Sequence, residues 1–413
     1  MLLLLSLWGA EGFAQTLDDY LQIAAENNPG VKAAYAEFEA AMQKAPQVSS
    51  LPDPELTMSA FGIGPMVQTE SGPQMANFSL MQMFPWFGTL GAKEDAAVLM
   101  AEAKYQAFND VRNKLFFKVS EQYFQLYALE KSIRFQEENI KILEDYKELA
   151  LAEVRSGSGA LADVLRTEIR MDDGRTALEI LKMQKKPTLV RFNALLNRNE
   201  NAEVNILEKP EIENFGLKTR QDSLFKNHPR VAQMQKMLAA AEANEKVARK
   251  NGLPKLGIGI DYMVIGKGMG MMDSGGDGRD AFMPMVSVSI PIFRKKYKAA
   301  RKEAEFMQES YSQRIIEVEN TLSAEYAETV FTLEKTREML ELYRNQTKNT
   351  KRVLDLLLSG YQNATVDFEE VLQTRQALLK YQLNIAQAEA DYFTGLSKIN
   401  YLTTETTNYE NQE

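Results

Sequence analysis

The chain has 413 residues and a formal net charge of −9, and its 48 Lys and Arg residues form no basic tail. Because a nucleic-acid-binding surface needs clustered basic side chains, this charge argues against a nucleic-acid partner. The chain has no cysteine and a single histidine, His228, which excludes disulfides, thiolate metal sites and most catalytic constellations, so we expect no enzyme and no bound cofactor.

Residues 1–14 are predicted to be a secretory signal peptide. An apolar run from Leu2 to Trp8 is followed by small residues up to Ala14, where a signal peptidase would cut. The usual basic residue before the run is missing, which leaves a buried N-terminal helix as the alternative. No other stretch holds 18 consecutive apolar residues, so the sequence predicts no membrane helix and indicates the periplasm, the outer membrane or the exterior.

Residues 15–196 are predicted to form a first structural repeat. Thr16 is a plausible helix cap, and short helices follow it. Apolar and polar residues then alternate over residues 55–61 and 76–83, which predicts two strands separated by a loop over 62–73. Pro85 ends the second strand, and helices are expected over about 93–155 and 161–196.

The predicted helix over 93–155 contains no proline and is rich in helix formers. About 60 residues at ~1.5 Å each give a helix of roughly 90 Å. Apolar residues recur every seven positions at Val119, Leu126, Ile133 and Ile140. This spacing is typical of a coiled-coil seam, so we expect the helix to pack lengthwise on another helix.

The second half repeats the landmarks of the first, after a polar connector over 197–222. Asn28-Pro29 recurs as His228-Pro229, and Leu51-Pro52 recurs as Leu253-Pro254. Pro85 recurs as Pro291, and Asp163-Val164-Leu165 recurs as Glu370-Val371-Leu372. These correspondences predict a two-fold internal repeat at the scale of a domain.

Residues 223–402 are therefore predicted to repeat the first plan. We expect strands over about 255–263 and 284–290 and helices over about 294–358 and 366–402, with a turn over 359–364. Pro291 would end the last strand where it passes into a helix. Residues 403–413 are polar and are predicted to be a disordered tail.

The four predicted strands suit a tilted crossing of a bilayer, with one apolar and one polar face. A lipid-embedded sheet cannot keep open edges, and four strands are too few to close a barrel. Several chains would have to pool their strands, and three chains would supply twelve. The alternative is a small soluble sheet in a periplasmic coiled-coil adaptor or structural protein, although helices this long exceed what such a sheet needs.

Several motifs together resemble the TolC-like outer-membrane efflux protein family. They are Thr16-Leu17-Asp18-Asp19-Tyr20 with Asn28-Pro29, Leu51-Pro52-Asp53-Pro54, Phe84-Pro85-Trp86-Phe87-Gly88 and Ile290-Pro291-Ile292-Phe293, within the two-fold repeat. The resemblance implies a homotrimer in which a twelve-stranded barrel in outer-membrane lipid continues as a periplasmic tunnel of long helices. It also implies two partners, a periplasmic adaptor and an inner-membrane efflux pump, and a channel that conducts their substrates passively.

The turns between paired helices are the candidate periplasmic mouth. Asp163 and Glu370 occupy equivalent places in the two repeats, and threefold symmetry would make each a ring of carboxylates that favours cations. A role in compensating the helix dipole is the alternative for both. The resemblance adds Tyr361 as a gate residue and leaves open an Asp163–Tyr361 hydrogen bond. Two further charged gate positions of the family hold Gln373 and Val366 here, so we expect no complete salt-bridge lock.

Three glycines, Gly157, Gly159 and Gly360, are assigned to these turns, whose tips would dock the adaptor. Methionine is frequent, with 20 residues, and thioethers bind monovalent copper or silver, which makes heavy-metal efflux conceivable. Met269, Met271 and Met272 are the weak candidates for a metal site. Methionines that only fill apolar surface are the alternative.

Overall fold

The computed structural model describes residues 16–60, 68–69, 72–206, 225, 227–266, 278–363 and 365–403. These residues divide into two compact units, each built from both halves of the sequence. The predicted signal peptide, most of the connector over 197–222, the tail after residue 403 and the three candidate methionines Met269, Met271 and Met272 lie outside the described residues.

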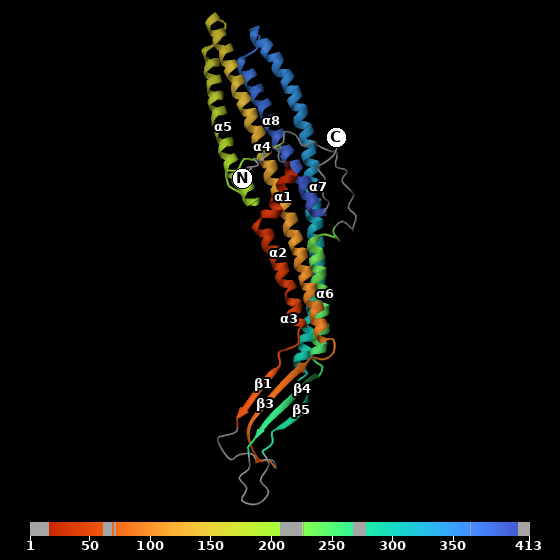
Figure 1. Cartoon of the computed structure of the whole chain (residues 1–413). Coiled ribbons are helices and arrows are strands. Elements are labelled where there is room, and N and C mark those ends of the chain that lie inside the picture. The colour runs from red at the N-terminus through yellow and green to blue at the C-terminus, as the bar shows by residue number, and fades with distance from the viewer. Residues whose placement is uncertain are drawn as a thin grey trace, which may run out of the picture. The chain divides into compact units, whose positions relative to one another are not determined.

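The helical unit consists of residues up to 34, 108–229 and 319 onward. Its long helices are α4 (Thr89–Ser156), α5 (Leu161–Leu195), α7 (Lys295–Gln362) and α8 (Phe368–Thr403), of which α4 and α7 begin in the other unit. Figure 1 shows them as two hairpins, α4 with α5 and α7 with α8. Val119, Leu126 and Ile140 of the predicted seam are buried, because heptad positions face the packed side of the helix.

Two short helices begin this unit. Helix α1 (Leu17–Asn27) starts at a capping box in which Thr16 and Asp19 satisfy each other's backbone N–H groups. Helix α2 (Pro29–Met42) starts at Asn28, whose side-chain Oδ1 accepts from the Gly30 N–H at 2.9 Å. The Asn28 amide also donates to the Leu195 carbonyl at 2.8 Å, which ties this helix start to the end of α5.

The sheet unit consists of residues 35–107 and 230–318. It includes helix α3 (Lys44–Ser49) and all of helix α6 (Pro229–Asn251) except its first residue. Its strands are β1 (Glu55–Ala60), β2 (Gln68–Thr69), β3 (Gly72–Phe84), β4 (Lys255–Ile265) and β5 (Ala281–Ser289). They form one antiparallel sheet in the order β1-β3-β4-β5, with β2 paired only to the start of β3 (Figure 1). The strands of the two sequence repeats therefore meet at the β3–β4 pair.

The two faces of this sheet differ sharply in character. Register places on one face the side chains of Leu56, Met58, Phe78, Leu80, Ile258, Ile260, Val286 and Val288. All of them are exposed, and the exposed fraction reaches 77% at Val286. The other face carries Thr57, Ser79, Gly257, Gly259, Asp261 and Ser287, together with five methionines that lie among them. The predicted division into an apolar and a polar face is thus present, and a large apolar surface is left uncovered within one chain.

Two predicted boundaries were wrong. The loop expected over 62–73 contains β2 and the first residues of β3, because Gln68–Thr69 pairs back onto Gly72-Pro73. The helix expected to end near residue 358 continues to Gln362, so Gly360 lies in the last turn of α7 and not in the connecting turn. A Cβ atom on Gly360 would come within 2.6 Å of the Val366 side chain, so this glycine provides room for the returning chain.

Helix α5 also runs through a proline in its interior, Pro187. Proline removes one backbone donor, which usually bends or ends a helix. The next residue, Thr188, donates its hydroxyl to the Gln184 carbonyl at 3.0 Å, and the helix continues to Leu195. In the described part of the chain, none of the helices combines the length and hydrophobicity of a membrane-spanning helix.

Candidate functional site

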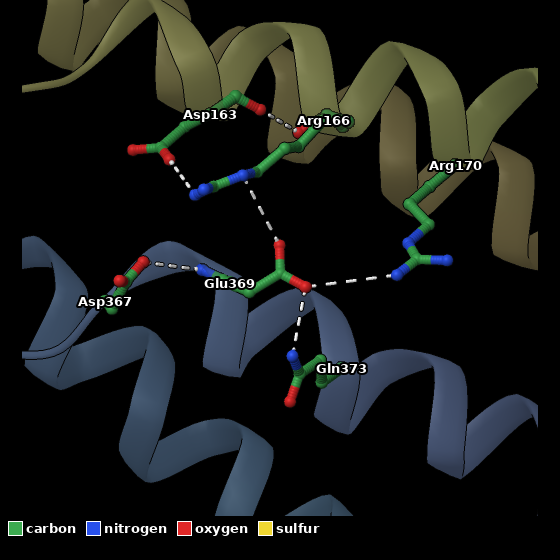
Figure 2. A network of polar contacts seen from close by, with 7 residues as sticks. Asp163, Arg166, Arg170, Asp367, Glu369 and Gln373 are labelled. Carbon is green, nitrogen blue, oxygen red and sulfur yellow. Dashed lines mark hydrogen bonds and ion pairs between the residues drawn. The ribbon is translucent and has the colours of Figure 1, made fainter.

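The N-terminal turns of α5 face the first turn of α8 and are joined to it by ion pairs (Figure 2). Arg166 Nε of α5 lies 3.7 Å from Glu369 Oε2 of α8, and Arg170 Nη2 lies 3.9 Å from Glu369 Oε1. These two helices are the returning arms of the two hairpins. A single carboxylate therefore links the two sequence repeats close to their turns.

Further hydrogen bonds fix the position of Glu369. Its backbone N–H donates to Asp367 Oδ1 at 2.9 Å, and Gln373 Nε2 donates to its Oε1 at 3.1 Å. Both carboxylate oxygens thus have partners, and the Asp367 side chain satisfies one of the free N–H groups at the start of α8. Gln373, which replaces a charged residue of the family pattern, takes part as a neutral donor.

Asp163 contributes the second carboxylate of the network. Its Oδ1 lies 3.4 Å from Arg166 Nη1, and its backbone carbonyl accepts the Thr167 hydroxyl at 2.8 Å. The residue is 9% exposed, and burial raises the pKa of its carboxyl above the usual value, against the opposing effect of Arg166. The nearby Asp367 carboxylate raises this pKa further. Burial thus makes ionisation of Asp163 costly even with a cation beside it.

Tyr361 does not join this network and instead belongs to an apolar cluster of the helical unit. Its ring centre is 4.5 Å from that of Phe368, and the cluster extends to Tyr146 and Val371. The Asp163–Tyr361 hydrogen bond that the sequence left open is not formed within the single chain, because the Tyr361 hydroxyl is buried without a hydrogen-bond partner among the described residues. Burial, and then the negative charge of Asp163, raises the pKa of this phenol.

Glu370 takes no part in the network shown in Figure 2. It follows Glu369 in the first turn of α8, and its side chain is exposed. The two adjacent glutamates have separate environments, since one is engaged by arginines and the other faces solvent. Sequence reasoning selected Glu370 by its equivalence to Asp163 and missed Arg166, Arg170 and Glu369. The first turns of both returning helices are acidic, and the available signal was the pair of arginines that follows in the next turns of α5, opposite in charge to Glu369.

The turn after α4 depends on its glycines. Gly157 has a φ of +83°, a left-handed conformation that glycine adopts without strain, and it ends the helix at Ser156. A Cβ atom on Gly159 would lie 2.7 Å from the Glu153 Cβ, so the chain passes too close for a side chain there. Ser158 completes the turn by donating its backbone N–H to the Glu153 carbonyl at 3.0 Å.

Two sets of polar contacts, around Arg375 and around Glu389, link the long helices. Arg375 Nε of α8 donates to Asn139 Oδ1 of α4 at 2.9 Å, and burial lowers the pKa of this guanidinium. Glu389 of α8 accepts from Tyr127 Oη at 3.0 Å and pairs with Lys131 at 2.5 Å and with Arg344 at 3.4 Å. The Glu389 carboxylate therefore links α4, α7 and α8 in one cluster.

The two proline junctions stand at the ends of the strands. Pro85 directly follows β3, and Pro291 lies two residues after the end of β5. Neither proline can donate a backbone hydrogen bond, which disfavours further strand pairing at these two points. The basic residues Arg294, Lys295 and Lys296 follow Pro291 at the start of α7.

A sheet with one uncovered apolar face, joined in each repeat to a pair of long helices, defines the class of outer-membrane export channels. Comparison of the sequence with known families agrees. The family model described as "Outer membrane efflux protein" matches residues 20–198 and 222–400. The chain therefore belongs to the outer membrane efflux protein family, and the two matched segments correspond to the two predicted repeats.

The individual proteins that match share no more than 25% sequence identity with this chain. The pyoverdine export outer membrane protein OpmQ of Pseudomonas putida is 25% identical over 278 residues, which cover 62% of this chain and 58% of that protein. The crystal structure of VceC from Vibrio cholerae matches with a TM-score of 0.75 at 15% identity, covering 94% of this chain and 96% of VceC. A CusC structure matches with a TM-score of 0.77 at 15% identity, covering 94% of this chain and 91% of CusC. At such identities the structures support the fold alone.

Proposed function

We propose that this chain is the outer-membrane channel of a tripartite efflux system. It would passively conduct substrates that an inner-membrane pump delivers through a periplasmic adaptor. The observation that carries this proposal is the apolar face of the sheet, on which Ile258, Val286 and Phe282 are each at least 60% exposed. Water is an unfavourable environment for so large an apolar surface, and bilayer lipid is a favourable one.

The sheet also has two open edges, β1 and β5. Unpaired backbone groups at these edges would have no partner inside a bilayer, so each edge must pair with another copy of the chain. A homotrimer that pairs β5 of one copy with β1 of the next closes a barrel of twelve long strands. Pro284 within β5 lacks an N–H, and the ladder at that edge must tolerate this gap.

Apolar side chains exposed on the helices support assembly in the same way. Leu161, Leu165 and Ile169 follow one another at four-residue spacing on α5, and each is more than half exposed in the single chain. Side chains spaced by four residues lie on one face of a helix. We assign this face to packing against a helix of the neighbouring copy in a helical tunnel.

The network of Figure 2 is proposed to be the periplasmic gate. Three copies would place rings of Asp163, Glu369 and Glu370 around the entrance, with Tyr361 packed beneath them. Arg166 and Arg170 compensate Glu369, so the exposed Glu370 would contribute most of the preference for cations. The adaptor would dock on the two adjacent turns. Gly157 and Gly159 lie in the first of them, and Gly360 lies just before the second.

The junctions at Pro85 and Pro291 are proposed to lie at the periplasmic edge of the membrane. The basic residues after Pro291 can there contact lipid headgroups. The proposed substrates include monovalent copper or silver ions, since methionine is abundant and thioether sulfur binds such ions. The relative OpmQ exports pyoverdine by its name, so an organic substrate is the competing candidate. Copper or silver sensitivity that is unchanged on deletion of the protein would exclude the metal.

A soluble periplasmic adaptor is the second candidate function. Cell fractionation separates the two, because a channel sediments with the outer membrane and runs as a heat-sensitive trimer in detergent. Planar-bilayer recordings then test conduction, and the cation preference should fall in an Asp163→Ala/Glu370→Ala double variant. Wild-type protein that is soluble without detergent and forms no pores would overturn the proposal.

A further inference from the structure

The polar face of the sheet carries more methionine than its apolar face. Register places on the polar face Met81, Met83, Met263, Met283 and Met285. Among the strand residues whose pairing fixes their face, the apolar face holds one methionine, Met58, while Met75 lies at the bulge of β3 and is assigned to neither face. Methionine that only supplied apolar surface to lipid would follow the opposite distribution.

Two of these thioethers converge on one point. Ser287 Oγ of β5 lies 3.7 Å from Met81 Sδ and 3.8 Å from Met83 Sδ, although both methionines belong to β3. Both side chains therefore reach across the intervening strand β4. One hydroxyl proton can be donated to only one sulfur at a time, so lone pairs of both sulfurs are directed toward a shared position.

Glycines on β4 make this convergence possible. A Cβ atom on Gly257 would lie 2.7 Å from Met83 Sδ and 3.1 Å from Met81 Sδ. A Cβ atom on Gly259 would lie 2.9 Å from Met81 Cε. Any larger residue at either position would displace the sulfurs, so the absence of side chains at the two glycines gives the thioethers the space that they occupy.

Further donors stand beside the pair of sulfurs. Met285 of β5 lies opposite Gly259 on the same face, and its flexible side chain can reach the same space. Asp261 follows two residues later on β4, and its buried Oδ1 has no hydrogen-bond partner among the described residues. Glu55 lies opposite Met81 on the other side, whereas Lys255 occupies the end of the face next to Ser289.

We infer that Met81, Met83 and Met285 form a binding site for a soft monovalent cation, Cu(I) or Ag(I), on the polar face. Thioether sulfur selects such ions, and low coordination numbers suit two or three sulfurs. The Asp261 carboxylate supplies negative charge without being a preferred ligand. No group of three or more His, Cys, Asp or Glu residues suited to a metal occurs in the described part of the chain, so hard divalent ions lack a comparable site.

This inference rests on the proposed function in one respect, namely that the polar face lines the conducted path. A site of few thioethers in that position would hold the ion weakly and release it outward, as conduction requires. It would let the channel favour a soft metal ion over other cations at a point distant in sequence from the carboxylates of the proposed gate.

The test is equilibrium binding of Ag(I) to the purified full-length protein in detergent, measured by calorimetry and by metal content after dialysis. A Met81→Leu/Met83→Leu variant keeps side-chain volume and should still fold. We expect it to bind Ag(I) at least about tenfold more weakly, or to lose about one equivalent per chain. Met58→Leu, on the opposite face, is the matched control and should bind like the wild type.

A triple variant of Met269, Met271 and Met272 to Leu distinguishes the competing location. Loss of Ag(I) binding in that variant, with none in Met81→Leu/Met83→Leu, would overturn the inference, as would equal loss in Met58→Leu. Because binding is measured without transport, it is independent of the proposed function. Wild-type protein that binds Ag(I) but forms no pores would overturn the function alone, and protein that forms pores but binds no Ag(I) would overturn the site alone.

Discussion

Arg166 Nε of α5 lies 3.7 Å from Glu369 Oε2 of α8, and this contact joins the two sequence repeats next to their helical turns. The two side chains are about half and less than one-third exposed, so water weakens the attraction and the pair alone contributes little stability. The ion pair matters because it joins the starts of α5 and α8, the returning helices of the two hairpins. A contact of small free energy can hold two hairpin ends together and still be broken when a partner docks.

The unpaired hydroxyl of Tyr361 leads to the first prediction. Because this hydroxyl is buried without a hydrogen-bond partner, its removal in Tyr361→Phe should leave the melting temperature unchanged or slightly raised. Channel conductance should also stay at the wild-type value. Thermal unfolding and bilayer recordings check both expectations. A melting temperature lowered by several degrees, or a wider pore, would show that the hydroxyl makes a bond that holds the gate.

The raised pKa of Asp163 predicts a pH-dependent effect. A carboxyl whose pKa is raised on folding stabilises the folded state fully below its ordinary value near 3.8, and this contribution is lost as the pH rises through the folded-state pKa. Asp163→Asn cannot ionise, so it should melt at a higher temperature than the wild type at pH 7. The difference should disappear near pH 3. A variant that is less stable at pH 7 would mean that the ion pair with Arg166 outweighs burial.

The cluster around Glu389 predicts the largest loss of stability. Glu389→Ala would leave Lys131 without its carboxylate in a poorly hydrated position between α4 and α8. We expect destabilisation of about 3 kcal/mol, measured by denaturant unfolding of the protein in detergent. Glu37→Ala is the matched control, because it breaks the exposed pair with Lys104 and should change stability little. Equal effects of the two variants would contradict the prediction.

Pro291 is predicted to act in assembly rather than in selectivity. It ends the pairing of β5 and redirects the chain toward α7, so Pro291→Ala should lower the yield of heat-sensitive trimer. The ion preference of the trimers that do form should be unchanged. Gel migration of heated and unheated samples measures the yield. A normal yield would count against the position of this residue at the membrane edge.

The long elements of this fold could be predicted from the sequence because their signals are repetitive. A proline-free run with heptad spacing indicates α4 over many turns, and the same landmarks recur in the second half. The alternation around Val286 and Val288 likewise identified β5. In each of these elements many residues indicate the same secondary structure, so the prediction does not depend on any single position.

The details of the candidate site could not be predicted in the same way. The pairing of Arg166 and Arg170 with Glu369 depends on how two helices are rotated against each other, and residues more than 190 positions apart in the chain determine it. The end of α7 was misplaced because Gly360 suggested a turn, whereas this glycine lies within the last helical turn and leaves room there for the Val366 side chain. The convergence of Met81 and Met83 depends on the register between β3 and β4, which composition does not specify.

We propose above all that this chain forms an outer-membrane channel whose entrance is held closed by the contact between α5 and α8. The most direct test compares single-channel conductance in planar bilayers of the wild type, Glu369→Gln and the neighbouring control Glu370→Gln. We predict discrete wild-type channels of low conductance, a clearly higher conductance in Glu369→Gln and the wild-type value, with weaker cation preference, in Glu370→Gln. Channels of equal conductance in Glu369→Gln and the wild type would contradict the gate, and the absence of channels in all three would contradict the function.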